Sequence, residues 1–389
     1  MALNPVISML GRRLRLGVIG GGSGSFIGAM HRQSARRDDR YQIVTGVLSS
    51  DPEKSRKAAA EIGIDSDRIY SSVQEMLGAE AARKDGIDVV AIMTPDDSHF
   101  TYSIAALEHG IDVICDKPMT STLEEAEALH KKVQETGLVF CLTHNYTGYP
   151  MVRQAKAMVM EGQLGIIRLV QVEYLQGGKA DESKPMPDVM TWKYDPVRGG
   201  PSRVMGDIGT HAHNLTRFIT GLEVDEVAAE LGTIVPNRPI HDYAGALLRF
   251  DNGGRGSFWV TQAAAGVENC LHIRVSGSLG TLEWTQEIPQ VLTFRPLRGP
   301  AQNRTPNGPG TLPLSARSTH LVAGHPEGFP DSFANLYSDA AEAIAARRAG
   351  LPADPLAMYF PSSLDGLLGL RFVNSVIESS SANGKWTKC

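Results

Sequence analysis

Short apolar runs alternate with amphipathic segments along the first 150 residues of the chain. The apolar runs predict five strands, at 14–19, 42–48, 87–93, 111–116 and 138–144. Helices are predicted between them, at 27–37, after Asp51, at 100–109, and from Thr122 to the residue before Gly137. Strands that are apolar throughout and separated by helices are typical of a doubly wound parallel sheet covered on both faces.

The pattern changes near Pro150. One more helix is predicted at 151–161, and strands follow it at 166–175, 224–235, 243–250, 255–262, 270–275 and 281–286. The sequence Asp-Asn-Gly-Gly at 251–254 is a strong hairpin turn, which indicates antiparallel pairing. Residues 298–328 are rich in Pro and Gly and are predicted to form a long loop, followed by helices at 331–349 and 364–379. We therefore expect two domains, 1–150 and 151–389.

Composition supports two ordinary globular domains and excludes several classes of function. The chain has 389 residues, of which 42% are hydrophobic and 21% charged, and its net charge is −5. Nothing in this balance favours binding to nucleic acid or to an anionic membrane. No apolar run has membrane-spanning length, and no basic segment with a cleavage site marks a signal peptide. Cys115 and Cys141 lie in apolar runs and are expected to be buried and reduced, so we expect a cytoplasmic protein.

The first strand runs into a glycine-rich segment that precedes the first helix. Glycines at such a turn allow backbone N–H groups to approach a pyrophosphate at a helix N-terminus. Gly20 and Gly22 fit the spacing of a dinucleotide-binding loop, and Gly28 is taken as the third glycine after a longer loop. A plain turn would use the same residue types, but the position between strand and helix favours cofactor binding. The candidate cofactor-binding residues here are Gly20, Gly22, Ser23, Gly24, Ser25, Phe26 and Ile27.

The end of the second strand is where an NAD enzyme usually places a carboxylate on the adenosine ribose. Here Ser49 and Ser50 occupy that position, followed by Asp51. If Ser49 holds the critical position, small hydroxyls together with Lys54 or Arg56 could accept a 2′-phosphate, and NADP is expected to be tolerated. The alternative is that Asp51 binds the ribose, although Asp51 also suits the cap of the next helix.

The third and fourth strands each end in polar residues, at the edge where open α/β sheets bind ligands. The candidates there are Thr94, Pro95, Asp97, His99, Asp116 and Lys117. A surface lysine before a turn proline is the plain alternative for Lys117.

A helical segment after Gly199 and Gly200 carries Asp207 and His211 four residues apart. A histidine beside a carboxylate can accept and return a proton near neutral pH. A buried structural histidine is the ordinary alternative. The ligand types and spacing in this segment are poor for a metal, and no metal site is predicted.

Taken in order, these motifs resemble those of the Gfo/Idh/MocA oxidoreductases: a glycine loop, Thr-Pro-x-x-x-His, Asp-Lys-Pro, and Asp-x-x-x-His. The resemblance covers nearly the whole chain. It implies a Rossmann domain followed by an α+β domain with a large, open, mostly antiparallel sheet, which often builds the interface of a homo-oligomer, here expected to be a dimer or tetramer. It also implies Lys117, Asp207 and His211 as catalytic residues. Candidate substrate-binding residues by the same resemblance are Tyr149, Arg153, Trp192, Asp207, His211 and His325.

The function implied is hydride transfer between NAD or NADP and a secondary hydroxyl of a sugar, a polyol such as inositol, or a related molecule. Such a reaction needs a base, a positive group on the oxygen and contacts that fix the carbon. His211 is assigned as the acid/base, Lys117 as the group that binds the reacting oxygen, and Asp207 as a ligand of a neighbouring hydroxyl or a group that tunes His211. Two alternatives stay open: a glycosidase or lyase that uses bound NAD transiently, and a sensor without catalysis.

Overall fold

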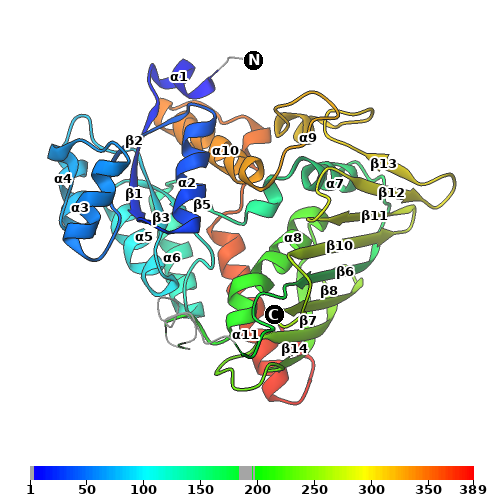
Figure 1. The fold of residues 1–389 in the computed structure, drawn as a ribbon. Helices are drawn as coiled ribbons and strands as arrows, with labels where there is room; N and C mark the ends of the chain where they lie inside the picture. Colours follow the sequence, from blue (N-terminus) through cyan, green and yellow to red (C-terminus); the bar gives the residue numbers. More distant parts are fainter. Residues whose placement is uncertain (1–3, 184–194, 196–197) are drawn as a thin grey trace. The chain divides into compact units, whose positions relative to one another are not determined.

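The computed structural model describes residues 4–183, 195 and 198–389 (Figure 1). The chain forms two compact units, the first comprising Met1–Asn145 with Phe329–Leu367 and the second comprising Tyr146–Gly328 with Leu368–Cys389. The sequence pattern assigns residues 151–389 to the second domain, whereas Phe329–Leu367 packs within the first unit. Helical periodicity shows that such a segment has an apolar side, but it does not show which core that side joins.

The first unit is built on a parallel sheet of five strands in the order β2-β1-β3-β4-β5. The strands are β1 (Leu14–Gly20), β2 (Tyr41–Val47), β3 (Val89–Met93), β4 (Asp112–Cys115) and β5 (Phe140–Leu142). The predicted parallel sheet is confirmed. β3 and β4 are buried along their whole length, which explains why their sequences are apolar without alternation.

Helices cover this sheet. They are α1 (Pro5–Leu10), α2 (Phe26–Arg37), α3 (Pro52–Glu61), α4 (Val73–Ala82), α5 (His99–Glu108), α6 (Leu123–Thr136) and α10 (Phe329–Ala349). The predicted caps are present: the Thr122 side chain accepts a hydrogen bond from Glu125 N, and Gly137 ends α6 in the left-handed conformation. α1 and α4 were not predicted.

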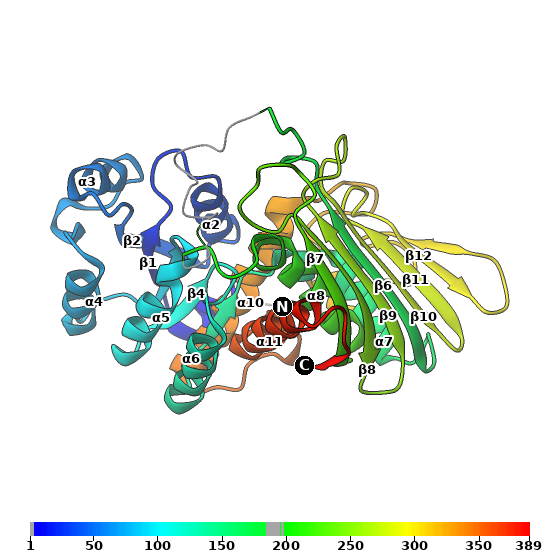
Figure 2. The ribbon, with the colours of Figure 1, turned by 90° about the horizontal axis from the view of Figure 1, so that it is seen from below.

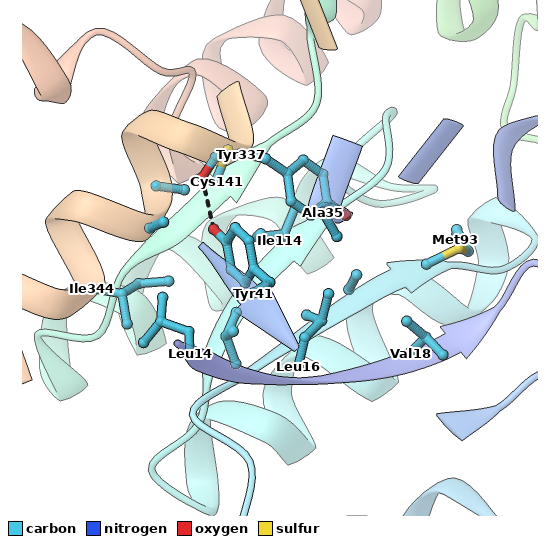
Figure 3. Close-up of a cluster of buried hydrophobic side chains, with 14 of the residues drawn as sticks. Leu14, Leu16, Val18, Ala35, Tyr41, Met93, Ile114, Cys141, Tyr337 and Ile344 are labelled. Carbon is cyan, nitrogen blue, oxygen red and sulfur yellow. Dashed lines mark hydrogen bonds between the residues drawn. The ribbon is translucent and has the colours of Figure 1, made fainter. Parts of the chain in front are cut away.

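Part of the core of this unit lies between one face of the sheet, α2 and α10. Alternate residues of β1, Leu14, Leu16 and Val18, point into it (Figure 3). Tyr337 of α10 joins the same cluster, and its carbonyl oxygen accepts a hydrogen bond of 2.7 Å from the Tyr41 hydroxyl. This burial explains why α10 belongs to the first unit although it follows most of the second in sequence.

Ion pairs also attach α10 to the sheet. Arg347 Nη2 lies 2.6 Å from Asp112 Oδ2, and Arg348 Nη2 lies 2.8 Å from Asp88 Oδ1. Both carboxylate side chains are at most 1% exposed. A buried carboxylate is costly without a partner, so these two arginines fix the C-terminal half of α10 beside β3 and β4.

The second unit is built on a sheet of nine strands in the order β13-β12-β11-β10-β6-β9-β8-β7-β14. The strands are β6 (Ile167–Leu175), β7 (Val224–Gly232), β8 (Tyr243–Phe250), β9 (Arg255–Thr261), β10 (Cys270–Gly277), β11 (Gly280–Thr285), β12 (Leu292–Pro296), β13 (Gln302–Arg304) and β14 (Thr387–Lys388). Among these pairs β6 and β9 run parallel and the others antiparallel. The predicted large, mostly antiparallel sheet is confirmed.

The predicted loop at 298–328 is partly wrong, because it contains β13 and the short helix α9 (Pro313–Arg317). β13 pairs with β12, which the sequence pattern also missed. β13 is the edge strand and has three residues, and β12 has five residues with only Leu292 and Phe294 buried, so neither gives a strong hydrophobic pattern.

Helices α7 (Pro150–Met160), α8 (Thr210–Thr220) and the second-unit part of α11 (Ser363–Ser381) lie along one face of this sheet (Figure 2). Phe372 of α11 stacks on His213 of α8, with ring centroids 4.5 Å apart, and meets Phe258 of β9 edge-on at 5.1 Å. On the other face Leu247 and Trp259 are 59% and 45% exposed.

Cys115 and Cys141 are buried and form no disulfide bond within the part of the chain that the structure describes, as expected. Within the part of the chain that the structure describes, no helix is long and apolar enough to cross a membrane. Over the same residues no group of three or more His, Cys, Asp or Glu side chains is arranged to hold a metal ion.

Glu283 of β11 links three neighbouring strands through ion pairs. Its carboxylate accepts hydrogen bonds of 3.1 Å from Arg274 on β10 and 2.6 Å from Arg295 on β12, and His272 Nε2 lies 3.2 Å away. Partial burial raises the pKa of Glu283, but the two guanidinium groups and His272 lower it more, to about 2.

We predict that acid will destabilise the wild-type protein more than a Glu283→Gln variant. A carboxylate with a lowered folded-state pKa contributes stability above its unfolded pKa of about 4.3, and this contribution is lost as the pH falls. The side chain keeps 24% exposure, so solvent screens the pairs and we expect the loss to be about 1–2 kcal/mol. Thermal melts through this pH range measure it. Glu287→Gln, at an exposed neighbour, is the matched control, and equal acid sensitivity of Glu283→Gln and wild type would contradict the prediction.

Candidate active site

The chain order of the first sheet reverses between β1 and β3, which are adjacent in space. From β1 the chain crosses to β2 on one side, and it then returns to β3 on the other. Gly20 at the end of β1 pairs with Met93 at the end of β3. Ligands of open α/β sheets bind outside the carboxyl ends of the strands at such a reversal. The glycine loop and Thr94 both start at this point.

The glycine loop is packed so closely that side chains are excluded. A Cβ atom on Gly20 would lie 2.7 Å from Thr94 Cγ2, and one on Gly22 would lie 2.6 Å from the Leu48 carbonyl oxygen. A Cβ on Gly28 would lie 2.3 Å from the carbonyl oxygen of Gly21. Gly28 therefore lets α2 pack directly against the loop, which is the packing role of the third glycine in a dinucleotide-binding loop.

The first turn of α2 follows this loop. Ser25 is the N-cap, and its side chain accepts a hydrogen bond of 3.1 Å from Gly28 N. Arg32, one turn further along, donates to the carbonyl oxygen of Gly21 and so ties the loop to the helix. Ser23, Gly24 and Phe26 are exposed, with Phe26 at 69%. A glycine cradle that excludes Cβ atoms and leads into a helix N-terminus fits the pyrophosphate of a dinucleotide.

After β2, the structure shows the contacts of Asp51 and of the two serines before it. Asp51 caps α3, because its side chain accepts hydrogen bonds from Glu53 N at 2.9 Å and Lys54 N at 3.1 Å. These backbone bonds lower the pKa of Asp51. The expected capping role is confirmed. Ser49 is half-buried, and its hydroxyl accepts a hydrogen bond from Asp51 N, whereas Ser50 and Lys54 are exposed.

Beyond β3 and β4 the chain forms two polar loops on the same edge of the sheet. Ser98 donates a hydrogen bond of 2.7 Å to the Thr94 hydroxyl, and Pro95 and Asp97 are half-buried beside them. Asp116 accepts a hydrogen bond of 2.8 Å from Thr143, and His31 Nε2 lies 3.9 Å from the same oxygen. Burial raises the pKa of Asp116, but His31, Lys117 and His99 lower it more, so this carboxyl is ionised. Lys117 follows it and is half-buried.

In the second unit Asp207 lies in a wide helical turn. Residues Met205–Gly209 form a π-helix that leads into α8. Such turns often occur at functional sites. The Asp207 carboxylate is 2.7 Å from Arg203 Nη2 and accepts a hydrogen bond of 2.9 Å from Gln262 Nε2, yet its side chain remains 23% exposed. Two donors hold this carboxylate in place, and part of it remains accessible to solvent.

His211 lies in the first turn of α8 and is 7% exposed. Its ring meets the Tyr146 ring edge-on, with centroids 4.8 Å apart, and Tyr174 is 6.3 Å away. The hydroxyls of Tyr146 and Tyr174 are hydrogen bonded to each other. Burial raises the pKa of Tyr174 well above its ordinary value, and Tyr146 and Asp207 act in the same direction, so Tyr174 stays protonated.

A chain of hydrogen bonds connects these tyrosines to Asp207. The Tyr174 hydroxyl donates a hydrogen bond of 2.9 Å to Asn269 Oδ1, which also accepts a hydrogen bond of 2.7 Å from Gln176 Nε2. Gln262 Nε2 donates to both Gln176 Oε1, at 3.0 Å, and Asp207. Carboxylate, amide and phenol groups next to a histidine are groups that can hydrogen-bond several hydroxyl groups.

The other candidates from the sequence differ in where they lie in the second unit. Tyr149 stacks on Tyr146, with ring centroids 6.3 Å apart, and so lies behind the tyrosine that meets His211. Tyr149 and Arg153 are 1% and 0% exposed, and Arg153 Nε donates to the Thr147 carbonyl oxygen at 3.1 Å. His325 is exposed in a loop, with Nδ1 at 3.2 Å from the Val322 carbonyl oxygen. Trp192 lies outside the described residues.

Sequence reasoning missed Arg203, Gln262, Gln176, Asn269 and Tyr174. Arg203 lies one turn before Asp207, a spacing that signals an ion pair on a helix. Tyr174 and Gln176 lie at the end of β6, Gln262 lies just after β9, and Asn269 lies just before β10. The three strands are adjacent in the sheet, with β6 in the middle, and nothing in the local sequence marks these residues.

Both units match known families. Residues 14–145 match the model of the oxidoreductase family with an NAD-binding Rossmann fold, and residues 152–283 match the GFO/IDH/MocA C-terminal domain.

Three relatives match over almost the whole chain. The uncharacterized oxidoreductase YfiI of Bacillus subtilis is 31% identical over 98% of both chains. An oxidoreductase from Sinorhizobium meliloti is 45% identical with a TM-score of 0.88, covering 97% of this chain and 100% of that one. An inositol dehydrogenase homolog from Azotobacter vinelandii, solved with NADH and myo-inositol, is 32% identical with a TM-score of 0.89, covering 98% and 99%.

Proposed function

The chain belongs to the GFO/IDH/MocA family of NAD-binding oxidoreductases, and on that premise we propose that it transfers a hydride between a nicotinamide cofactor and a secondary hydroxyl of a sugar, an inositol-like polyol or a related molecule. One observation carries the proposal. His211 lies beside a continuous set of hydrogen-bonding groups, from the tyrosine pair through Asn269 and the two glutamines to Asp207. Such a set can bind vicinal hydroxyls and orient one of them toward a base.

The chemistry divides between the cofactor and the protein. The nicotinamide, when bound, accepts or supplies the hydride. His211 takes the hydroxyl proton during oxidation and returns it during reduction. Lys117 hydrogen-bonds the reacting oxygen and stabilises the negative charge that develops on it. Asp207, fixed by Arg203 and Gln262, accepts a hydrogen bond from a neighbouring hydroxyl. Tyr149, Arg153, Trp192 and His325 complete the proposed substrate-binding set.

We assign dinucleotide binding to the glycine loop, the first turn of α2 and the segments after β2, β3 and β4. Gly20, Gly22 and the α2 N-terminus would hold the pyrophosphate. Ser49, Ser50 and Lys54 would hold the adenosine ribose, and Thr94 and Lys117 would hold the nicotinamide end. In this assignment NADP is tolerated beside NAD, because Asp51 is engaged as a helix cap and small hydroxyls remain at the ribose position.

We further propose a cytoplasmic homo-oligomer, a dimer or a tetramer, assembled through the open face of the nine-stranded sheet. Leu169, Leu247 and Trp259 place large apolar side chains on that face with 55%, 59% and 45% exposure. Exposed apolar side chains grouped on one face favour protein association. Light scattering of the purified protein measures the oligomer size.

The test of the activity is a panel of inositols, aldoses, glycosides and sugar acids, each assayed with NAD⁺ and with NADP⁺ by the absorbance of the reduced nicotinamide. At least one compound in the panel should be oxidised with stoichiometric reduction of the cofactor. Consumption of a substrate without net reduction would contradict the proposal and indicate a lyase or glycosidase that recycles bound NAD. Cofactor binding without turnover of any compound would favour a sensor.

Replacing Ser49 by aspartate is expected to shift cofactor preference toward NAD by about tenfold or more. The new carboxylate can hydrogen-bond both ribose hydroxyls and repels a 2′-phosphate. Dissociation constants of NADH and NADPH, measured by fluorescence on the variant and on wild type, test this. Ser66→Asp, at an exposed serine of the same unit, is the control. Strong selectivity of the wild type for NAD would show that another group reads the ribose.

A further inference from the structure

His99 is the first residue of α5, and its side chain is completely buried in the first unit. Its ring lies between the two loops that follow β3 and β4. Nδ1 is 2.8 Å from the carbonyl oxygen of Pro118, and Nε2 is 3.0 Å from the carbonyl oxygen of Thr94. Both distances are those of good hydrogen bonds.

Each of the two acceptors constrains the protonation of the ring. A backbone carbonyl oxygen can only accept a hydrogen bond, so each ring nitrogen must donate. Neutral imidazole carries one N–H, and it would set an unprotonated nitrogen against one of the two carbonyl oxygens. Both contacts are favourable only when both nitrogens carry hydrogen, which makes the ring a cation.

The surroundings of His99 can compensate a buried positive charge. Asp96 precedes it in the loop after β3. Cys115 is the last residue of β4, and Asp116 and Lys117 begin the loop that follows. Burial lowers the pKa of His99, but Cys115, Asp96 and Asp116 raise it more, to about 10. The ionised Asp116 carboxylate provides a negative charge on the adjoining loop.

We propose that His99 is a buried imidazolium that ties the loop after β3 to the loop after β4 and thereby positions Thr94 and Lys117. The sequence grouped His99 with the cofactor-binding residues. In this structure both of its nitrogens face backbone carbonyl oxygens, so it acts through the loops and is a positioning residue. The expected effect of His99 on turnover rests on the proposed role of Lys117, whereas the protonation of His99 does not depend on it.

The protonation state is tested directly on the wild-type protein by ¹⁵N–¹H NMR of labelled histidine, with or without cofactor. Both nitrogens of His99 should be protonated from about pH 6 to about pH 8, where an ordinary histidine loses its proton. Asp96→Asn, which removes one compensating charge, should move the titration of His99 to lower pH. An unprotonated nitrogen at neutral pH in the wild type overturns the proposal, whatever the enzyme's substrate.

The positioning role is tested with His99→Gln, which keeps one donor, and His99→Leu, which keeps none. We expect kcat to fall by about tenfold in the first and by up to about 10²-fold in the second, the effect that a misplacement of about 1 Å can have. KM for the sugar or polyol should change less than kcat. His109→Gln, at the exposed histidine that ends the same helix, is the matched control.

The outcomes separate this inference from the proposed function. Near-native kcat in a well-folded His99→Leu variant overturns the positioning role even if NMR shows a cation. If wild type oxidises no compound of the panel, the proposed function fails, while the NMR result still decides the protonation of His99. If His99→Leu does not fold, the comparison rests on His99→Gln and the NMR measurements.

Discussion

Replacing Lys117 by alanine is expected to lower kcat by about 10²–10³-fold, by analogy with the loss of one oxyanion donor. β4 ends at the buried Cys115, and the ionised Asp116 and then Lys117 follow it. Lys117 therefore lies at the edge of the sheet where the parallel strands end. Removing its ammonium group takes away the charge that stabilises the alkoxide-like transition state. Lys117→Arg keeps a positive charge but changes its shape and reach, so partial recovery is expected.

Steady-state kinetics on the best substrate of the panel measure this effect, and a thermal melt shows that the variant is folded. Lys84→Ala, at an exposed lysine of the same unit, is the matched control. If Lys117→Ala turns over at nearly the native rate, Lys117 does not bind the reacting oxygen and the plain alternative of a surface lysine is favoured.

The order of strands and helices in the first unit could be predicted because each element carries its own local signal. Buried strands are apolar runs, and caps such as Thr122 and Asp51 mark helix starts. α4 was missed: its buried apolar side chains Val73, Met76 and Leu77 form only a short stripe, which is interrupted by Gly78 and continues in the buried Glu80. The domain to which α10 belongs could not be predicted, because its partners Tyr41, Asp88 and Asp112 are about 230 to 300 residues away in sequence.

In the candidate site, too, some parts carry a local sequence signal and others do not. The glycine loop and the motifs after β3 and β4 are contiguous in sequence, so their clustering at one sheet edge follows from a parallel topology. The hydrogen-bonded set around Asp207 depends instead on which strands are neighbours and in which register. Gln262, Gln176 and Asn269 meet because β9, β6 and β10 are adjacent, and that order is not readable from any one segment.

Replacing His211 by alanine is expected to lower kcat for alcohol oxidation by about 10²–10⁴-fold, because a positioned general acid/base contributes about that much. The residual rate should rise with pH, since hydroxide from solvent can replace the lost base. His211 lies among the tyrosines and amides of the second unit, whereas the glycine cradle belongs to the first. The affinity for NADH should therefore change little, and this separates a chemical defect from a binding defect.

Three measurements on His211→Ala decide the assignment: kcat against pH, the dissociation constant of NADH by fluorescence, and a thermal melt. His109→Ala, at an exposed histidine, should leave all three unchanged. His211→Asn, which keeps a polar side chain but no titrating group, should be as slow as His211→Ala if proton transfer is what is lost. A well-folded His211→Ala with near-native turnover would contradict the assignment. Asp207 would then be the leading candidate for the base, because its carboxylate is held by Arg203 and Gln262 and remains 23% exposed, whereas Tyr174 keeps its proton.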